Sequence, residues 1–213
     1  EPTINSNGSI NSLVSANAAG AFSIVKYTTN GSSSTRIGHG LSSTPVVTLY
    51  KKTSGTGNWQ WLTTQIDGSY DNLILNDTTA KSDSSLGVPT ATTISAESGS
   101  TGTTMIAYCF HDVAGYQKFG TYTGNGSASG PYVALGFEPD FVMLKRTDST
   151  SNWAIVDSVR GGSYSDSKKV VFANLSNGES ESGDIGKSIE FNAVGHGSNS
   201  TGGFQLKNGD NPF

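Results

Sequence analysis

Short runs of alternating apolar and polar residues recur along the whole chain, and each run is typical of a β-strand. Phe22 to Tyr27 alternates, and Val46 to Tyr50 is almost continuously apolar. In the run from Trp59 to Leu62, alternation places Trp59 and Trp61 on one face. No stretch carries the i, i+3, i+4, i+7 spacing of an amphipathic helix. We therefore expect an all-β fold with very little helix.

The later runs extend this pattern to the C-terminal half. Further candidate strands are Asn72 to Asn76, Thr103 to Phe110 and Asp140 to Lys145. The Gly and Ser residues at 99–102 favour a hairpin between Thr92 to Ile94 and the strand that follows them. Short strands joined by turns about every 8–12 residues are the pattern of a two-sheet β-sandwich or a jelly-roll-like body.

One stretch of the sequence occurs twice. Tyr27-Thr28-Thr29-Asn30-Gly31-Ser32 matches Tyr122-Thr123-Gly124-Asn125-Gly126-Ser127 at five of six positions, with an offset of 95 residues. The pair Asn58-Trp59 matches Asn152-Trp153 with an offset of 94 residues. Ordered matches at a nearly constant offset indicate an internal duplication. The Asn-Gly step in both copies is a turn signal, because both residue types tolerate positive φ.

The duplication divides the chain into three parts. Residues 1–19 form a lead-in or an edge strand, residues 20–113 the first β repeat, and residues 114–213 the second. The link from His111 to Gly115 has no Pro-rich or Ser-rich spacer, so we expect the repeats to pack as one compact unit. Two independent sandwiches are the alternative, because about 95 residues can close a small sandwich alone.

Composition limits the class of protein. Aromatic residues are 9% and charged residues only 14%, whereas disordered chains combine high charge with few aromatics. The net charge of −4 disfavours a nucleic-acid partner, which needs clustered Lys and Arg. No apolar run reaches the roughly 18 residues of a membrane span. We expect a folded protein with neither a nucleic-acid nor a membrane partner.

The sequence offers no recognisable catalytic set. The three histidines stand alone in or beside turns: His39, His111 and His196. The single cysteine, Cys109, lies in an apolar strand, where a small core residue is expected. Acyl transfer needs a nucleophile, a base and an orienting acid, and glycoside hydrolysis needs two paired carboxylates. We predict that the protein is not an enzyme and has no catalytic residues, with a polysaccharide hydrolase as the enzymatic alternative.

One loop offers oxygen ligands for a cation. The segment Asp67-Gly68-Ser69-Tyr70-Asp71-Asn72 contains carboxylate and amide groups but lacks the EF-hand pattern. A solvated polar loop is the simpler interpretation. We predict no metal site and no cofactor, and we retain calcium in this loop as the alternative.

Aromatic side chains among polar residues are the candidates for a binding surface, because carbohydrate sites typically combine an exposed ring with Asn, Asp and Gly. The candidate ligand-binding residues are four aromatics: Trp61, Tyr70, Tyr116 and Tyr164. Trp61 has no aromatic counterpart in the second copy, where Ile155 stands. The duplicated Asn-Trp pairs instead predict a structural role for Trp59 and Trp153 as core anchors.

Four short segments have a specific resemblance to a known family: Gly38-His39-Gly40-Leu41, Ala107-Tyr108-Cys109-Phe110, Tyr122 to Gly126, and Asn152-Trp153. With the residues around them, from Ala16 to the C-terminus, they resemble a duplicated β-sandwich module of tailed-phage structural proteins. This module is widespread in tail fibres and related appendages of marine and other aquatic phages. One departure is that no second equivalent of the Ala-Tyr-Cys-Phe strand follows Lys207, so we expect the last sheet edge to be shortened or completed by a neighbouring chain.

The resemblance implies a non-enzymatic virion component, in a tail fibre, an appendage or a surface decoration, that is involved in host attachment. Its expected partners are other copies of itself, in a homo-oligomer, other virion proteins, and host surface glycans. The expected location is the extracellular virion. Because the chain begins Glu1-Pro2 without an initiating Met, we interpret it as a processed product or a piece of a longer protein. The alternative function is a lectin-like carbohydrate-binding domain of a cell-surface adhesin.

Overall fold

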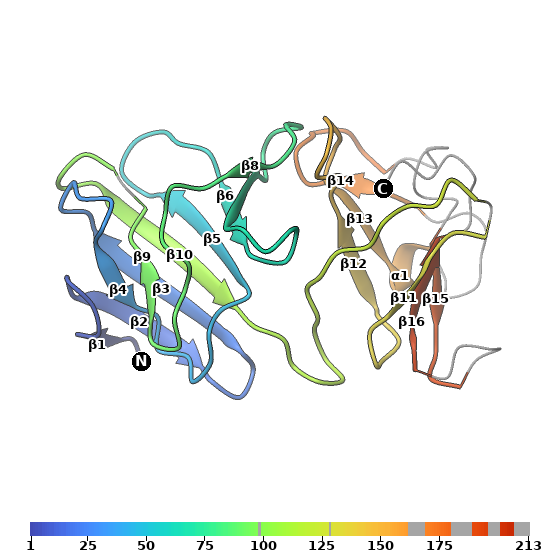
Figure 1. Cartoon of the computed structure of the whole chain (residues 1–213), viewed down its shortest axis with the longest axis horizontal. Helices are drawn as coiled ribbons and strands as arrows, with labels where there is room; N and C mark the ends of the chain where they lie inside the picture. Colours follow the sequence, from blue (N-terminus) through green and yellow to red (C-terminus); the bar gives the residue numbers. More distant parts are fainter. Residues whose placement is uncertain (98, 128, 162–168, 180–188, 196–200, 207–213) are drawn as a thin grey trace. The chain divides into compact units, whose positions relative to one another are not determined.

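The chain folds into two compact units, and each is described by itself. The computed structural model describes residues 1–97, 99–127, 129–161, 169–179, 189–195 and 201–206. Unit 1 comprises Glu1–Leu75 and Lys81–Val113, and unit 2 comprises Asn76–Ala80 and Ala114–Phe213. In Figure 1 the strands of unit 1 run from blue to green, and those of unit 2 from yellow to red. The packing of the two repeats as one unit stays a prediction.

An eight-stranded antiparallel sheet is the larger layer of unit 1. In spatial order its strands are β1 (Thr3–Asn5), β2 (Ser12–Asn17), β3 (Phe22–Thr28), β10 (Thr104–Phe110), β5 (Val47–Lys52), β6 (Gln60–Thr63), β7 (Asp71–Ile74) and β8 (Ser82–Asp83). The Ala-Tyr-Cys-Phe segment therefore lies at the centre of the sheet, in β10. The segment at residues 1–19 supplies the edge strand β1 and its neighbour β2.

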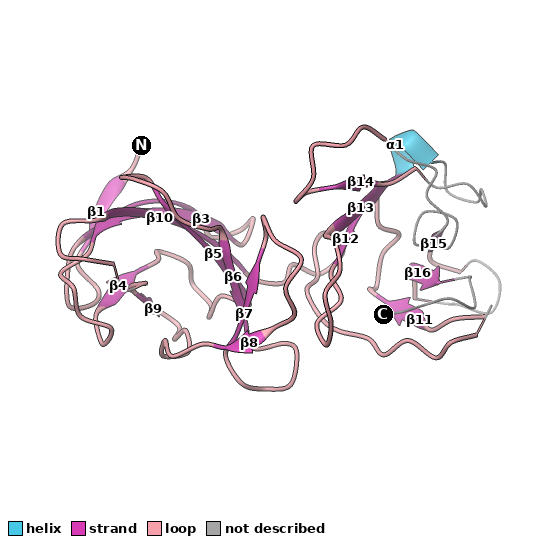
Figure 2. Ribbon diagram, turned by 90° about the horizontal axis from the view of Figure 1, so that it is seen from above, coloured by secondary structure: helices cyan, strands magenta, loops and turns pink. Residues whose placement is uncertain are grey.

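A smaller sheet of β4 (Arg36–Gly38) and β9 (Thr93–Ser95) covers the concave face of the large sheet (Figure 2). Alternation directs one face of each large-sheet strand into the core between the layers. The core residues are Val14, Val25, Tyr27, Tyr50, Leu62, Tyr70, Met105, Ala107 and Cys109 from the large-sheet side, with Ile37, Leu41, Ile94 and Ala96 opposite. The Tyr50 hydroxyl joins the layers by donating to the Ser95 carbonyl at 2.7 Å.

The prediction of a hairpin between β9 and β10 is wrong. β9 pairs with β4, and β10 pairs with β3 and β5 in the other layer. The physical reason is that the core needs apolar side chains from two facing layers, and Ile94 supplies one of them from β9. The turn at 99–102 thus carries the chain from one layer to the other.

The Gly38-His39-Gly40 segment passes very close to the N-terminal strands. A Cβ on Gly38 would lie 2.0 Å from Asn5 Oδ1, and a Cβ on Gly40 would lie 2.7 Å from a methyl group of Val14. Gly40 also has φ +73°, a conformation that side chains with a Cβ rarely adopt. Both glycines are therefore explained by packing of this turn against β1 and β2.

The described residues of unit 2 form two three-stranded antiparallel sheets. One has the order β11 (Tyr132–Ala134), β16 (Gly203–Leu206), β15 (Ile189–Asn192), and the other the order β12 (Phe141–Leu144), β13 (Ala154–Asp157), β14 (Val171–Phe172). Their core residues are Val142, Leu144, Ala154, Val156, Val170, Ile189, Phe191, Phe204 and Leu206. The single short helix of the described residues, α1 (Ser158–Gly161), is one turn long. The all-β, sandwich-like fold class is confirmed.

Two hairpins, one in each unit, share the same register. Val47 pairs with Thr63 in unit 1, and Phe141 pairs with Asp157 in unit 2. Both members of the second pair lie 94 positions after those of the first (141 − 47 = 157 − 63 = 94). The third strands also match, because the N–H of Leu75 donates to the Trp59 carbonyl and that of Ala173 to the Trp153 carbonyl, each at 3.0 Å. The duplication stays a prediction, and this common register supports it.

Candidate functional site

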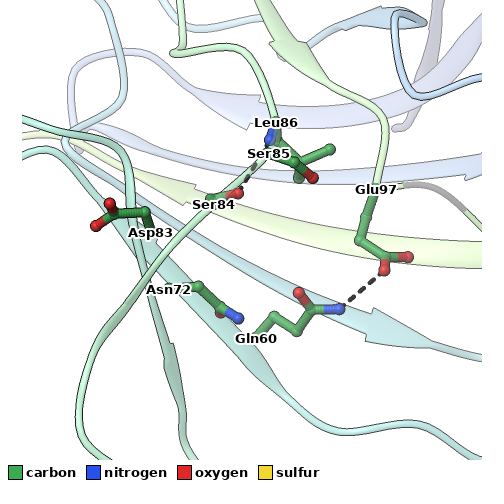
Figure 3. Close-up of a pocket in the computed structure, with 7 residues that line it drawn as sticks. All are labelled: Gln60, Asn72, Asp83, Ser84, Ser85, Leu86 and Glu97. Carbon is green, nitrogen blue, oxygen red and sulfur yellow. Dashed lines mark hydrogen bonds between the residues drawn. The ribbon is translucent and has the colours of Figure 1, made fainter.

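A small polar pocket opens in unit 1 between the large sheet and the loops beside it (Figure 3). Its volume is about 180 Å³, and it is half-open to solvent. The lining residues are Gln60, Asn72, Asp83, Ser84, Ser85, Leu86 and Glu97. Pockets for drug-sized ligands measure roughly 300–1,000 Å³, so this one suits a single small polar group.

Neighbouring strands place the amide side chains in the pocket. Gln60 begins β6, and Asn72 lies in β7 opposite Leu62, so both share the face that Leu62 directs into the core. Glu97 follows β9 in the other layer, and its Oε1 accepts a hydrogen bond of 2.9 Å from Gln60 Nε2. The pocket thus lies at the rim of the sandwich, where polar side chains replace the apolar core.

The chemistry of the pocket suits ligands with hydroxyl groups. The buried Oδ1 of Asn72 accepts no hydrogen bond within the part of the chain that the structure describes. Buried polar atoms normally have a partner, so an acceptor of this kind is suited to a ligand donor or a water. Figure 3 shows the Asp83 carboxylate pointing away from the other side chains, whereas Glu97 reaches toward Gln60. The two acids therefore do not face each other as a catalytic carboxylate pair would.

The carboxylates of the acidic loop considered for calcium bind the ammonium group of Lys81. The Lys81 ammonium lies 2.5 Å from Asp67 Oδ2, 2.6 Å from Asp71 Oδ1 and 3.4 Å from Asp83 Oδ1. Hydrogen bonding first to Asp67 and then to Asp71 raises the pKa of Lys81, and the bond from Lys81 lowers the pKa of Asp67. Among the described residues, no group of three or more His, Cys, Asp or Glu is arranged to hold a metal ion.

His39 is held by the backbone on both sides of its ring. Its Nδ1 accepts the N–H of Leu41 at 3.1 Å, so the proton of the neutral ring is on Nε2, which donates to the Thr90 carbonyl at 3.2 Å. The side chain is fully buried, and burial lowers the pKa of His39 from its usual value. This histidine is a hydrogen-bonded core residue.

Cys109 is also a core residue, as the sequence predicts. It is 0% exposed on the inner face of β10, and burial raises the pKa of the thiol to about 12. The reactive form of cysteine is the thiolate, which is scarce at neutral pH when the pKa is so high. A nucleophilic role for this thiol therefore has no support.

The four candidate ligand-binding aromatics have different surroundings. Tyr70 is 5% exposed in the core of unit 1, so it is corrected to a core residue, because its ring is needed between the two layers. Trp61 is half-buried on the opposite face of the large sheet from the core. Tyr116 is 71% exposed in unit 2, and Tyr164 lies outside the described residues. None of the three described aromatics, Trp61, Tyr70 and Tyr116, is among the residues that line the pocket.

Of the two predicted core anchors, one is confirmed and the other is wrong, because Trp59 lies outside the core of unit 1. Trp153 is 3% exposed, so its prediction as a buried anchor is confirmed. Trp59 is half-buried and stacks on Tyr108, with ring centroids 6.2 Å apart, and the Lys51 ammonium lies 5.5 Å from the Trp59 ring. Phe22 continues this row of rings, stacking on the other side of Tyr108 at 6.3 Å. The outer face of the large sheet thus carries an aromatic row.

Sequence reasoning missed the pocket residues Gln60 and Asn72. Each is a single amide inside a strand, and only the register of β6 and β7 brings the two together with Glu97. The one available signal was a polar residue on an otherwise apolar strand face, at Gln60 beside Leu62 and at Asn72 beside Ile74. A polar residue at a core-facing position of a strand indicates where the apolar core ends.

The fold and the pocket define an all-β protein with two compact units and a small polar cavity in the first. The chain belongs to a family described as "Domain of unknown function (DUF7483)", whose sequence pattern matches residues 1–211. No curated protein and no solved structure matches the chain. Within the described residues, no helix is long and apolar enough to cross a membrane.

Proposed function

We propose that this chain is a non-enzymatic structural module of a tailed-phage virion, in a tail fibre, an appendage or a surface decoration, and that it contributes to host attachment. The observation that carries the proposal is that three chemically reactive side chains of unit 1 have structural roles. His39 is held in one neutral tautomer, the Cys109 thiol is buried, and the Asp71 carboxylate is paired with Lys81. The sequence resemblance supplies the phage assignment.

The surface of the module is suited to dense packing of copies. Its turns are built from Ser, Thr, Asn and Gly, and only 14% of the residues are charged. A surface of this kind avoids both large apolar patches and strong repulsion between like charges. Many copies on one particle also strengthen a weak attachment, because each further contact is made at a high effective concentration.

Purification of particles from the cells that encode the chain tests the proposal. Mass spectrometry of gradient-purified particles should find the chain at a fixed ratio to the other virion proteins, and gold-labelled antibodies should decorate one structure on each particle. Enrichment in the cell envelope fraction, with none on particles, would refute the virion assignment and favour an adhesin.

The second candidate function is carbohydrate binding, as in a lectin-like domain, and the pocket favours it. Asn72 offers an acceptor without a protein partner among the described residues, and Gln60 and Glu97 add an amide and a carboxylate nearby. Amides and carboxylates bind pairs of sugar hydroxyls, and a pocket of about 180 Å³ suits a small polar group such as the hydroxyl-bearing edge of one sugar unit. In the virion proposal the same pocket would contact host glycans.

A glycan array with matched variants tests this second function. Asn72→Ala removes the acceptor and should weaken binding of any retained glycan about tenfold or more. Asn177→Ala removes an exposed amide in unit 2 and should leave binding unchanged. Trp61→Ala distinguishes the outer face of the large sheet from the pocket, because a loss of binding with this variant alone would place the ligand on the outer face. Absence of any retained glycan would overturn the carbohydrate proposal.

A further inference from the structure

Among the described residues, the hairpin of β12 and β13 in unit 2 lacks a neighbour that its counterpart in unit 1 has. In unit 1, β5 pairs with β6 on one edge and with β10 on the other. In unit 2, β12 pairs with β13, and no strand that the structure describes pairs with its other edge. The two hairpins have the same register, so the open edge of β12 corresponds to the edge of β5 that β10 occupies.

The hydrogen bonds show which backbone groups of β12 point to this open edge. The N–H of Ser158 donates to the Asp140 carbonyl at 2.9 Å across the hairpin. Backbone groups in an antiparallel strand face its two neighbours alternately, so Val142 and Leu144 also face β13. Phe141 and Met143 therefore direct their N–H and C=O groups outward, as Val47 and Leu49 do toward β10.

Side-chain burial agrees with a missing strand. Val47 is 1% exposed beside Phe110 of β10, whereas Phe141, at the equivalent position of β12, is 56% exposed. An exposed phenyl ring on an unpaired edge strand is a surface that natural sheets usually cover or protect with charge. Within the part of unit 2 that the structure describes, no strand gives the ring of Phe141 the cross-strand neighbour that Phe110 provides for Val47.

We propose that the open edge of β12 binds an extended segment of another polypeptide as an added antiparallel strand. The occupant is a strand with the chemistry of β10, because that strand fills the equivalent place in unit 1. In β10, the small residues Ala107 and Cys109 face the core opposite Tyr50 and Thr48, and the large Phe110 lies on the outer face. The added strand would place small side chains against Leu144 and Val142, and a large apolar one against Phe141.

Strand addition of this kind obtains affinity from main-chain hydrogen bonds and specificity from alternate side chains. It would link unit 2 of one molecule to a neighbouring polypeptide without any change to the sheet already formed. The inference does not depend on the pocket or on a virion location, because it rests on the register and burial of β12.

A labelled peptide of residues 102–112, with Cys109→Ser to prevent oxidation, tests the proposal by fluorescence anisotropy against the full chain. Saturable binding is expected. In β10 the Thr104 carbonyl accepts from the N–H of Thr53, which directly follows β5, so Tyr108, an even number of residues away, also faces β5. N-methylation at Tyr108 should weaken binding about tenfold or more, whereas N-methylation at Ala107, which faces the other side, should not.

Two protein variants locate the binding edge. Met143→Pro removes only an outward N–H, which an edge strand tolerates, and should abolish binding of the peptide. Met143→Ala keeps the N–H and should retain binding. Absence of saturable binding to the wild-type chain overturns the proposal, and so does binding that survives both Met143→Pro and methylation at Tyr108. If Met143→Pro proves unfolded by circular dichroism, the two methylated peptides decide the question on the wild-type chain.

Discussion

The ammonium group of Lys81 lies 2.6 Å from Oδ1 of Asp71, a carboxylate whose side chain is fully buried. The other oxygen of Asp71 has no hydrogen-bond partner among the described residues. The positive charge of Lys81 is therefore the main interaction that stabilises this buried carboxylate. Lys81 is itself only 24% exposed, and it also contacts Asp67 and Asp83. This lysine joins the acidic loop before β7 to the edge strand β8.

Replacement of Lys81 by Met should lower the Tm of unfolding, because it leaves a buried carboxylate without its cation. The matched control is Lys26→Met, which removes an exposed lysine of β3 and should leave Tm nearly unchanged. The double variant Lys81→Met with Asp71→Asn should recover part of the loss, because the uncompensated charge is gone. A Lys81→Met variant as stable as the wild type would show that the cluster has no structural role.

Substitution of Gly40 by Ala tests both the backbone conformation of its turn and the packing of that turn against β2. Gly55→Ala should cost about 1–2 kcal/mol, because residue 55 has φ +86° in open space. Gly40→Ala should cost about 1–3 kcal/mol more, since its Cβ would also lie 2.7 Å from a Val14 methyl group. Urea denaturation of both variants measures the difference. Equal losses of stability would show that the turn does not pack tightly against β2.

Burial of His39 predicts a pH dependence of stability. Its pKa is lowered in the folded protein, so between that value and the unfolded value of about 6.5 the unfolded chain binds more protons. The free energy of unfolding should therefore fall as the pH drops below about 6.5, by at most about 1.4 kcal/mol per pH unit from this group.

Urea denaturation at pH 7.5 and at pH 5.5 tests this sign. Carboxylates contribute to the pH dependence of every variant. The loss of unfolding free energy between pH 7.5 and pH 5.5 is therefore compared between the wild type and His39→Gln. The wild type should lose more stability on acidification than the variant does. An identical loss in wild type and His39→Gln would contradict the buried, neutral imidazole.

The thiol of Cys109 should be protected in the native state. Its pKa of about 12 and its complete burial predict very slow reaction with a disulfide reagent such as DTNB at pH 8. The same thiol should react at once in concentrated urea, where β10 no longer covers it. Rapid stoichiometric labelling of the native protein would show that the centre of the large sheet opens readily.

Local sequence signals predicted much of the fold, because they depend on a few adjacent residues. The Asn-Gly turns are a clear case: Ser32 N–H donates to Asn30 Oδ1 at 3.1 Å, and Ser127 N–H donates to Asn125 Oδ1 at 3.0 Å. Alternation likewise located β3, β5 and β10 and identified Cys109 as a core residue.

The pairing of strands and the pocket could not be predicted in the same way. β9 and β10 are adjacent in sequence but lie in different layers, and no local feature of Ile94 shows this. Gln60, Asn72 and Glu97 meet only because of the register of three distant segments. Alternation shows that successive residues of a strand lie on opposite faces of the sheet. It does not show which face becomes the core, so it could not show that Tyr70 is buried and that Trp61 lies on the outer face.

Cryo-electron microscopy of intact particles tests the proposed structural role in a virion. We expect many copies of the chain in fixed, symmetry-related positions on a tail fibre, an appendage or the capsid surface. Particles without density for this fold, together with a free monomeric protein that binds glycans through an open groove, would contradict the structural role and support the adhesin alternative.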